Sequence, residues 1–190
     1  MLRSDFLNYL IDARQYRSYL EIGCDQNVTF DAIRATLKVG VDPIQGGTVT
    51  LTSDAFFLNN TRQFDLVFID GLHLKEQVLR DVDNALRCLS SNGTIVLHDC
   101  LPTMEQHQER TRQLAEWTGD VWKAAVEIRG RQDLDMATLN IDWGLGVIVR
   151  RPNSAILPVM SESLTWSDYV VNRDYLLRVM DFDDMREFIN

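Results

Sequence analysis

Acidic and imidazole side chains recur at the ends of short apolar segments in the first part of the sequence. Each segment is typical of a β-strand, and the groups that follow the five segments are Glu21 and Gly23, Asp42, Ser53 and Asp54, Asp70 and His73, and His98 and Asp99. Carboxylates bind cations and accept hydrogen bonds from hydroxyl groups, and histidine transfers protons near neutral pH. A single acidic strand end is as readily a helix N-cap or a surface residue. Acidic residues after all five segments predict one shared binding site.

An open parallel sheet would bring these residues together. Segments typical of strands cover residues 19–22, 38–42, 49–52, 64–69 and 94–97; helical patterns fill 29–37 and 74–89, with residues 91–93 ending the second helix. Strands and helices that alternate at this spacing predict parallel βαβ units. Residues 64–69 are nearly all apolar, which is typical of a strand covered by helices on both faces. Ligands of such sheets bind beyond the carboxyl ends of the strands.

The rest of the chain predicts the elements around this sheet. Apolar residues at helical spacing predict an N-terminal helix within residues 1–17. We expect residues 104–117 to be helical, 121–129 to form a helix or a strand, and 136–141 with 145–149 to form an antiparallel hairpin. Residues 151–190 are expected to form a tail with a docked terminal helix. We therefore predict a single domain over residues 1–190, with its core at residues 18–150. Its fold class is expected to be α/β, with a mostly parallel sheet flanked by helices and a C-terminal antiparallel hairpin.

Composition and charge exclude several partners. The chain has 190 residues, of which 45% are hydrophobic and 25% charged, and its formal net charge is −9. These proportions are those of a globular domain, and a negative surface disfavours binding to nucleic acid or to an anionic membrane. No segment reaches the roughly 20 apolar residues of a membrane helix, and no secretory signal pattern opens the chain. Three cysteines without CxxC spacing indicate neither a disulfide framework nor a zinc site, so we expect a cytoplasmic protein.

The loop after the first strand discriminates between nucleotide ligands. A dinucleotide site needs GxGxxG there, so that backbone N–H groups can hold a pyrophosphate. This chain has Gly23-Cys24-Asp25-Gln26-Asn27-Val28, in which Asp25 would repel phosphate. Asp42 still follows Gly23 by about 20 residues, where an acid is expected to bind ribose hydroxyls. A ribose-binding acid in an acidic site without a phosphate loop suits a cationic nucleoside such as S-adenosylmethionine.

The same residues resemble the successive motifs of class I S-adenosylmethionine-dependent methyltransferases. The similar segments are residues 20–23, 41–42, 53–55, 68–73 and 97–99, and residues 144–147 are similar to the closing strands of that fold. The Ile-Asp-Gly-x-His motif at residues 69–73 resembles a subgroup that includes O-methyltransferases acting on sugars and macrolide natural products. The resemblance spans residues 17–100 and implies a Rossmann-like methyltransferase fold. The sequence departs from the family in its first loop, where only Gly23 matches the usual two or three glycines, and at Thr94, which replaces a glycine.

By this resemblance each strand end has an expected role. Glu21 and Gly23 would line the methionine part of the cofactor, Asp42 would bind its ribose, Ser53 and Asp54 would lie beside adenine, and Asp70 would face the amino-acid group or a metal. Asp70 and Asp99 match the carboxylates that hold a divalent cation in metal-dependent relatives, with Mg²⁺ as the expected ion. Mg²⁺ prefers oxygen ligands, so water or substrate would have to complete a site with two carboxylates.

Methyl transfer to a hydroxyl group requires removal of the hydroxyl proton. His73 is our candidate base, because its unperturbed pKa near 6.5 suits the task; the alternatives are that it caps the next helix or stacks on adenine. Asp99 is the second candidate catalytic residue, and ordering its own loop is the alternative. Trp117, Trp122 and Trp143 either stack on a ring of the acceptor or belong to the core and surface.

These observations predict an S-adenosylmethionine-dependent methyltransferase that acts on oxygen of a small molecule or a sugar hydroxyl. One alternative is a methyltransferase-like domain that binds cofactor or serves in assembly without catalysis. Another is a nucleotide-dependent oxidoreductase, which the missing glycines disfavour. The expected partners are a small-molecule acceptor and, through helices at both ends of the chain, a second copy of the protein.

Overall fold

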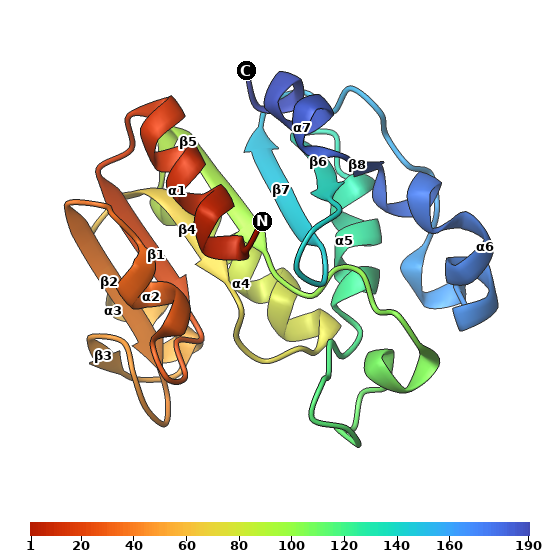
Figure 1. Cartoon of the computed structure of the whole chain (residues 1–190), viewed down its shortest axis with the longest axis horizontal. Coiled ribbons are helices and arrows are strands. Elements are labelled where there is room, and N and C mark those ends of the chain that lie inside the picture. The colour runs from red at the N-terminus through yellow and green to blue at the C-terminus, as the bar shows by residue number, and fades with distance from the viewer.

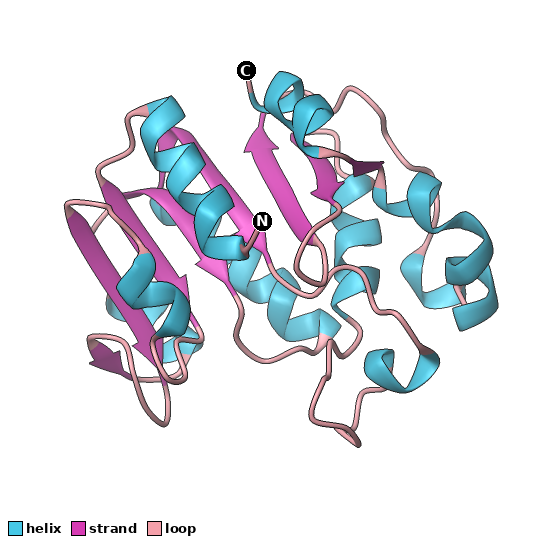
Figure 2. Cartoon of the chain, viewed as in Figure 1, coloured by secondary structure: helices cyan, strands magenta, loops and turns pink.

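The structure is a computed structural model that describes residues 1–190. Its centre is a sheet of eight strands in the order β3-β2-β1-β4-β5-β7-β6-β8 (Figures 1 and 2). The strands are β1 (Ser18–Ile22), β2 (Leu37–Asp42), β3 (Val49–Thr50), β4 (Phe64–Ile69), β5 (Leu89–Leu97), β6 (Leu134–Leu139), β7 (Leu145–Arg150) and β8 (Val179–Met180). Neighbouring strands are parallel except where β7 pairs with β5 and β6. The predicted α/β class, with its parallel sheet and antiparallel hairpin, is confirmed.

Helices cover both faces of this sheet (Figure 2). They are α1 (Arg3–Arg14), α2 (Val28–Ala32), α3 (Ser53–Asn59), α4 (Lys75–Cys88), α5 (Val121–Arg129), α6 (Trp166–Leu177) and α7 (Phe182–Ile189), with short 3₁₀ turns at Glu105–Gln108 and Ser161–Ser163. Side chains of α1 and α7 form one hydrophobic core with the sheet, and those of α4, α5 and α6 form the other. Strand β4 contributes Leu66 and Phe68 to the first core and Val67 and Ile69 to the second. Its continuous apolar sequence is therefore explained by burial on both faces.

The predicted helix at residues 29–37 is wrong beyond its first turn. Helix α2 ends at Ala32, and Ile33 is extended with ψ 135°. The Asn8 side chain of α1 accepts a hydrogen bond from the Arg34 N–H and donates one to the Ala32 carbonyl. Because Asn8 satisfies these backbone groups, the chain can leave the helix without an unpaired donor.

The turn predicted at residues 91–93 is also wrong, because these residues belong to β5. Helix α4 ends at Cys88, and Leu89 already pairs with Phe64 of β4, after which the register shifts. The next pair is Leu66 with Thr94, so β5 carries an irregularity between the two pairs. A Cβ on Gly93 would lie 2.8 Å from the Asp65 carbonyl oxygen. The glycine therefore permits close approach of two strands and does not end a helix.

Two expectations on the second half of the chain need correction. Residues 104–117 form only the 3₁₀ turn at Glu105–Gln108 and then a loop, because residues 109–116 are almost all exposed and have no apolar face to bury. The terminal segment contains two helices, α6 and α7, joined by the short strand β8, and Arg178 breaks the helix with φ 48°. The remaining ambiguity at residues 121–129 is resolved as helix α5.

Candidate active site

A cavity of about 990 Å³ opens at the carboxyl ends of the parallel strands. The strand order reverses between β1 and β4, and sheets of this class bind their ligands at such a point. All eight residues predicted for the site line this cavity: Glu21, Gly23, Asp42, Ser53, Asp54, Asp70, His73 and Asp99. Residues separated by up to 78 positions in the chain therefore share one hollow, as the sheet topology predicts.

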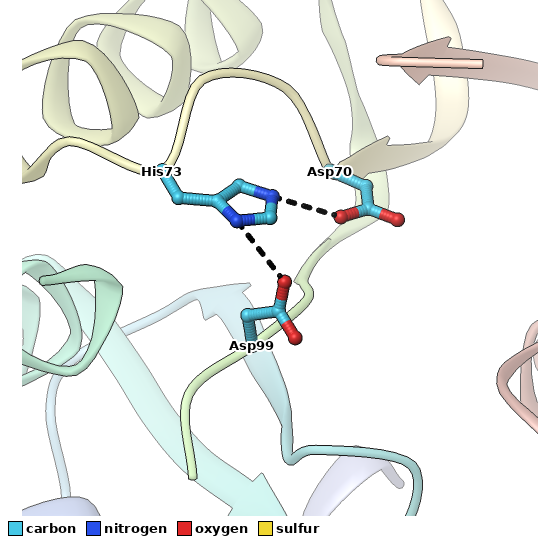
Figure 3. Close-up of side chains that lie close together, drawn as sticks. All are labelled: Asp70, His73 and Asp99. Carbon is cyan, nitrogen blue, oxygen red and sulfur yellow. Dashed lines mark hydrogen bonds and ion pairs between the residues drawn. The ribbon is translucent and has the colours of Figure 1, made fainter. Parts of the chain in front are cut away.

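His73 joins the strand ends of β4 and β5 (Figure 3). Its Nε2 lies 3.3 Å from Asp70 Oδ1, and its Nδ1 lies 3.3 Å from Asp99 Oδ2. Nδ1 also lies 2.8 Å from the Trp117 carbonyl oxygen, and the indole of Trp117 stacks on the imidazole with ring centroids 5.1 Å apart. Burial lowers the pKa of His73, but the two carboxylates outweigh it and raise the pKa above its usual value.

His98 is the buried member of the same cluster. Its Nδ1 lies 3.2 Å from Asp70 Oδ1 and 3.1 Å from Asp99 Oδ1. Its Nε2 is buried without a hydrogen bond, 3.6 Å from Asp142 Oδ1. Burial opposes the charged imidazolium, but the surrounding carboxylates hold the pKa of His98 well above its usual value. Burial alone would raise the pKa of Asp70, but the effect of His98 and His73 is larger, so the pKa of Asp70 is lowered.

Two charged residues that contact the cluster of Asp70 and His98 were not predicted from the sequence. Arg3, in the first turn of α1, donates from Nη1 to Asp70 Oδ2 at 2.8 Å and from Nε to Asp142 Oδ2 at 3.0 Å. Asp142 lies in the β6–β7 turn, and its pKa is lowered by the nearby His98 imidazole and by Arg3. The only available signal was an acidic residue in the turn of a predicted hairpin, and nothing local links it to a residue 139 positions away.

Glu21 lies at the floor of the cavity with 1% of its surface exposed. The Tyr19 hydroxyl donates a hydrogen bond to its carboxylate. Burial raises the pKa of Glu21 to about 8, against the lowering effects of Tyr19, Arg3 and Lys38. Near neutral pH this carboxyl therefore holds a proton in the ligand-free protein.

Asp42 ties together two loops of the cavity wall. Its Oδ2 accepts hydrogen bonds from the N–H groups of Cys24 and Asp25, and its Oδ1 accepts from those of Ile44 and Gln45. Burial raises its pKa, but these four backbone donors outweigh it, and the pKa is lowered. A carboxylate offers about four acceptor sites, so the loops already use the full capacity of Asp42.

The far end of the cavity is formed where α3 meets α4. Thr52 caps α3 by accepting from the Ala55 N–H, which places Ser53 and Asp54 in the first helical turn. The strand predicted at residues 49–52 therefore ends at Thr50. Gln77 of α4, a cavity residue not predicted from the sequence, donates to Ser53 Oγ at 3.1 Å and to the buried Asp81 at 3.0 Å.

The three candidate tryptophans have different environments. Trp117 and Trp143 line the cavity, and Trp143 packs edge-on against His107 with centroids 5.0 Å apart. Trp122 is fully buried and packs against Tyr169, so it belongs to the core. The loop that carries Trp117 also supplies Arg112 and Glu116 to the cavity wall.

The donor atoms of Asp70, His73 and Asp99 lie close enough together to hold a metal ion. One ligand atom of each lies within 4.8 Å of the others, so the three side chains could converge on one ion. Two carboxylate oxygens and one imidazole nitrogen fit a divalent transition-metal ion better than Mg²⁺, which prefers oxygen alone. The donor set thus fits a divalent cation that displaces the proton of His73.

Comparison with known proteins agrees with this fold. Residues 9–100 match a family model described as a methyltransferase domain, and this segment contains every strand end of the site. The match covers just under half of the chain, which is similar there to a methyltransferase domain. A sequence comparison with curated proteins found no match.

Several solved structures have the same fold at low sequence identity. The methyltransferase PaMTH1 of Podospora anserina, bound to S-adenosylhomocysteine, is 17% identical over 78% of each chain, with a TM-score of 0.56. An O-methyltransferase of Bacillus cereus, also with S-adenosylhomocysteine, is 14% identical over 78% of this chain and 80% of its own, with a TM-score of 0.58. TomG of Streptomyces achromogenes, an O-methyltransferase of tomaymycin synthesis in complex with S-adenosylmethionine, is 17% identical over 78% of this chain and 79% of its own, with a TM-score of 0.54.

None of the helices in this protein is both long and apolar enough to span a membrane.

Proposed function

We propose that this protein is a class I, S-adenosylmethionine-dependent methyltransferase that transfers the methyl group of its cofactor to a hydroxyl oxygen of a small molecule, with sugar and macrolide hydroxyls as the leading acceptor class. One observation carries the proposal: every acidic strand end predicted to hold a cationic nucleoside lines the same cavity. The first loop of that cavity lacks the glycines of a pyrophosphate site. Two of the solved structures of this fold are O-methyltransferases.

The cofactor is proposed to lie along the strand ends. Glu21, Gly23 and Asp70 would surround its methionine part, and Ser53 and Asp54 its adenine. Asp42 stays at the ribose position, where its four backbone hydrogen bonds support a role in shaping the two loops that flank the sugar. The acidic wall favours the sulfonium and ammonium charges of the cofactor.

His73 is proposed as the base. In an in-line displacement the acceptor oxygen forms a bond to the methyl carbon, the carbon–sulfur bond breaks, and S-adenosylhomocysteine leaves. The proton of the hydroxyl passes to a ring nitrogen of His73. Binding of a cationic cofactor beside Asp70 would lower the pKa of His73, because like charge disfavours the imidazolium. The base would therefore be available once the cofactor is bound.

Asp70 and Asp99 are the proposed ligands of a divalent cation, and His73 beside them would remain free to act as the base. When bound, such an ion would acidify the acceptor hydroxyl. With or without the ion, the protein side chains would hold and orient the acceptor. We expect Asp99→Asn to abolish any dependence of turnover on added Mg²⁺ or Mn²⁺, measured after treatment with a chelator. Metal dependence that survives in Asp99→Asn would argue against this ligand set.

Titration calorimetry tests the cofactor directly. We expect S-adenosylmethionine and S-adenosylhomocysteine to bind, and NADH to give no fluorescence enhancement on mixing. Absence of binding at millimolar ligand would overturn the proposed function. Turnover is then measured as S-adenosylhomocysteine release with a panel of sugar, macrolide and phenolic acceptors. Cofactor binding without turnover on the whole panel would favour a role without catalysis.

A further inference from the structure

A permanent cation enters the acidic cavity from the first turn of α1. Arg3 is fixed by Asp142, whose Oδ2 accepts from both the backbone N–H at 2.9 Å and Nε at 3.0 Å. Nη1 donates to Asp70 Oδ2 at 2.8 Å and lies 3.2 Å from His98 Nδ1. Nη2 makes no hydrogen bond to the protein, and Arg3 lines the cavity. Figure 1 places the start of α1 beside the ends of β4 and β5.

The Arg3 guanidinium can supply the positive charge that the carboxylate of the cofactor requires. The amino-acid group of S-adenosylmethionine carries an ammonium and a carboxylate. The carboxylate of Asp70 suits the ammonium, and its negative charge disfavours a carboxylate. Only two arginines and no lysine line the cavity. Arg112 donates to the carbonyls of Leu114 and Ala115 in its own exposed loop, whereas Arg3 lies next to Asp70.

We propose that Arg3 binds the α-carboxylate of S-adenosylmethionine, with Asp142 as the residue that positions it. This assignment rests on the proposed function. The free Nη2 can form a charge-assisted hydrogen bond with one carboxylate. Because Asp142 holds Nε and the backbone of α1, the guanidinium is ordered before the ligand arrives, and little side-chain entropy is lost on binding. The ion pair between Arg3 and Asp70 thus presents opposite charges to the two ends of a zwitterion.

Two ligands that differ only in the carboxylate test the proposal. S-adenosylhomocysteine carries the carboxylate, and its decarboxylated analogue, an adenosyl 3-thiopropylamine, keeps the ammonium and the nucleoside. We expect the wild-type protein to bind S-adenosylhomocysteine about tenfold or more tightly than the analogue, as measured by calorimetry. Arg3→Met keeps the apolar stem and should remove this preference by weakening only S-adenosylhomocysteine. Arg112→Met is the matched control and should preserve the preference.

The outcomes separate this proposal from the proposed function. Wild-type protein that binds both ligands equally, or an Arg3→Met variant that loses affinity for both to the same extent, would overturn the role of Arg3 alone. Wild-type protein that binds neither would overturn the proposed function as well. If thermal melting shows that Arg3→Met does not fold, Asp142→Asn replaces it. Its expected result is a selective loss for S-adenosylhomocysteine, and an unchanged preference there would count against the proposal.

Discussion

At the residue scale, the chemistry of the site depends on the neighbours of His73. Its ring is fixed by Asp70 and Asp99 on its two nitrogens and by the carbonyl and indole of Trp117. A histidine held on both nitrogens and on one face has a defined orientation, which a base needs if it is to meet a hydroxyl at hydrogen-bond distance. These contacts show that His73 is not a free surface side chain.

We predict that His73→Ala lowers turnover at least about tenfold while leaving the affinity for S-adenosylhomocysteine nearly unchanged. The reason is that the base acts on the acceptor and not on the cofactor. Turnover is measured as S-adenosylhomocysteine release, and affinity by calorimetry. His107→Asn serves as the control, since His107 contacts neither Asp70 nor Asp99. A large loss of cofactor affinity in His73→Ala would instead place the residue in the cofactor pocket.

At the element scale, the walls of the cavity depend on Asp42. Its four backbone hydrogen bonds join the loop after β1 to the loop after β2. These loops contain no other carboxylate with this set of contacts, and hydrogen bonds to charged groups contribute about 1.5–3 kcal/mol each at most. Asp25 and Asn27 also join the two loops, by accepting hydrogen bonds from the Gln45 side chain and the Gly47 N–H, but only Asp42 accepts from four backbone N–H groups.

Asp42→Ala should lower the free energy of unfolding by about 3 kcal/mol and also weaken binding of S-adenosylhomocysteine, because four backbone N–H groups lose their acceptor. Urea unfolding with and without ligand measures both quantities. Asp54→Ala, at a more exposed cavity carboxylate, should change the stability by only about 0.5 kcal/mol. If Asp42→Ala lost affinity with no loss of stability, direct ribose binding would be the better description of Asp42.

Helix α4 contains a buried acid whose charge disfavours folding. Asp81 is 1% exposed, and burial raises its pKa to about 6, against hydrogen bonds from Ser53 and Gln77. Its unfolded value is about 3.9. Because the folded protein binds the Asp81 proton more tightly than the unfolded chain does, the protonated carboxyl contributes its full stabilisation below the unfolded pKa of about 3.9. This stabilisation is lost as the pH rises through the folded pKa of about 6.

We therefore expect Asp81→Asn to be more stable than the wild type at pH 7.5, by a margin on the order of 2–3 kcal/mol. This margin should shrink as the pH falls from about 6 to about 4, since the wild-type carboxyl is then protonated. Urea midpoints of both proteins over this pH range measure the effect. A difference that does not vary with pH would contradict the assigned ionisation.

At the scale of the whole molecule, a buried acid attaches the C-terminal segment to the sheet. Asp135 of β6 is fully buried, and its carboxylate binds Arg151 at 2.9 Å and Arg178 at 2.8 Å. Ser154 also donates to it. Beyond this cluster, α6 and α7 bury Leu177, Met185 and Ile189 in the two cores. The last forty residues are thus held both by apolar packing and by one ion cluster.

Asp135→Asn should cost about 3 kcal/mol of unfolding free energy, because it leaves two partly buried arginines without a charged partner. The measurement is urea denaturation followed by tryptophan fluorescence. Arg186→Met removes an arginine whose pair with Asp183 is exposed, and it should change stability by less than about 1 kcal/mol. Equal effects of the two substitutions would show that the buried cluster contributes no more than a surface pair.

The sequence alone predicted those elements whose pattern is set by burial. The nearly all-apolar strand at residues 64–69, the amphipathic α4 and the antiparallel hairpin agree with the structure to within a few residues. Predictions failed where a distant side chain decides the local backbone. Asn8 ends α2, and pairing with Phe64 draws residues 89–93 into a strand. Neither contact is visible within a window of neighbouring residues.

The candidate site divides in the same way. Residue types at the strand ends determined that a cationic nucleoside was the expected ligand, because parallel strands bring their carboxyl ends to one edge of a sheet. Which charges touch was decided only by the tertiary structure. Arg3 reaches Asp70 and Asp142 because α1 crosses the sheet, and Trp117 reaches His73 because a long loop returns over the cavity. Strand ends follow from local periodicity, whereas contacts between distant segments depend on how helices and loops pack over the sheet.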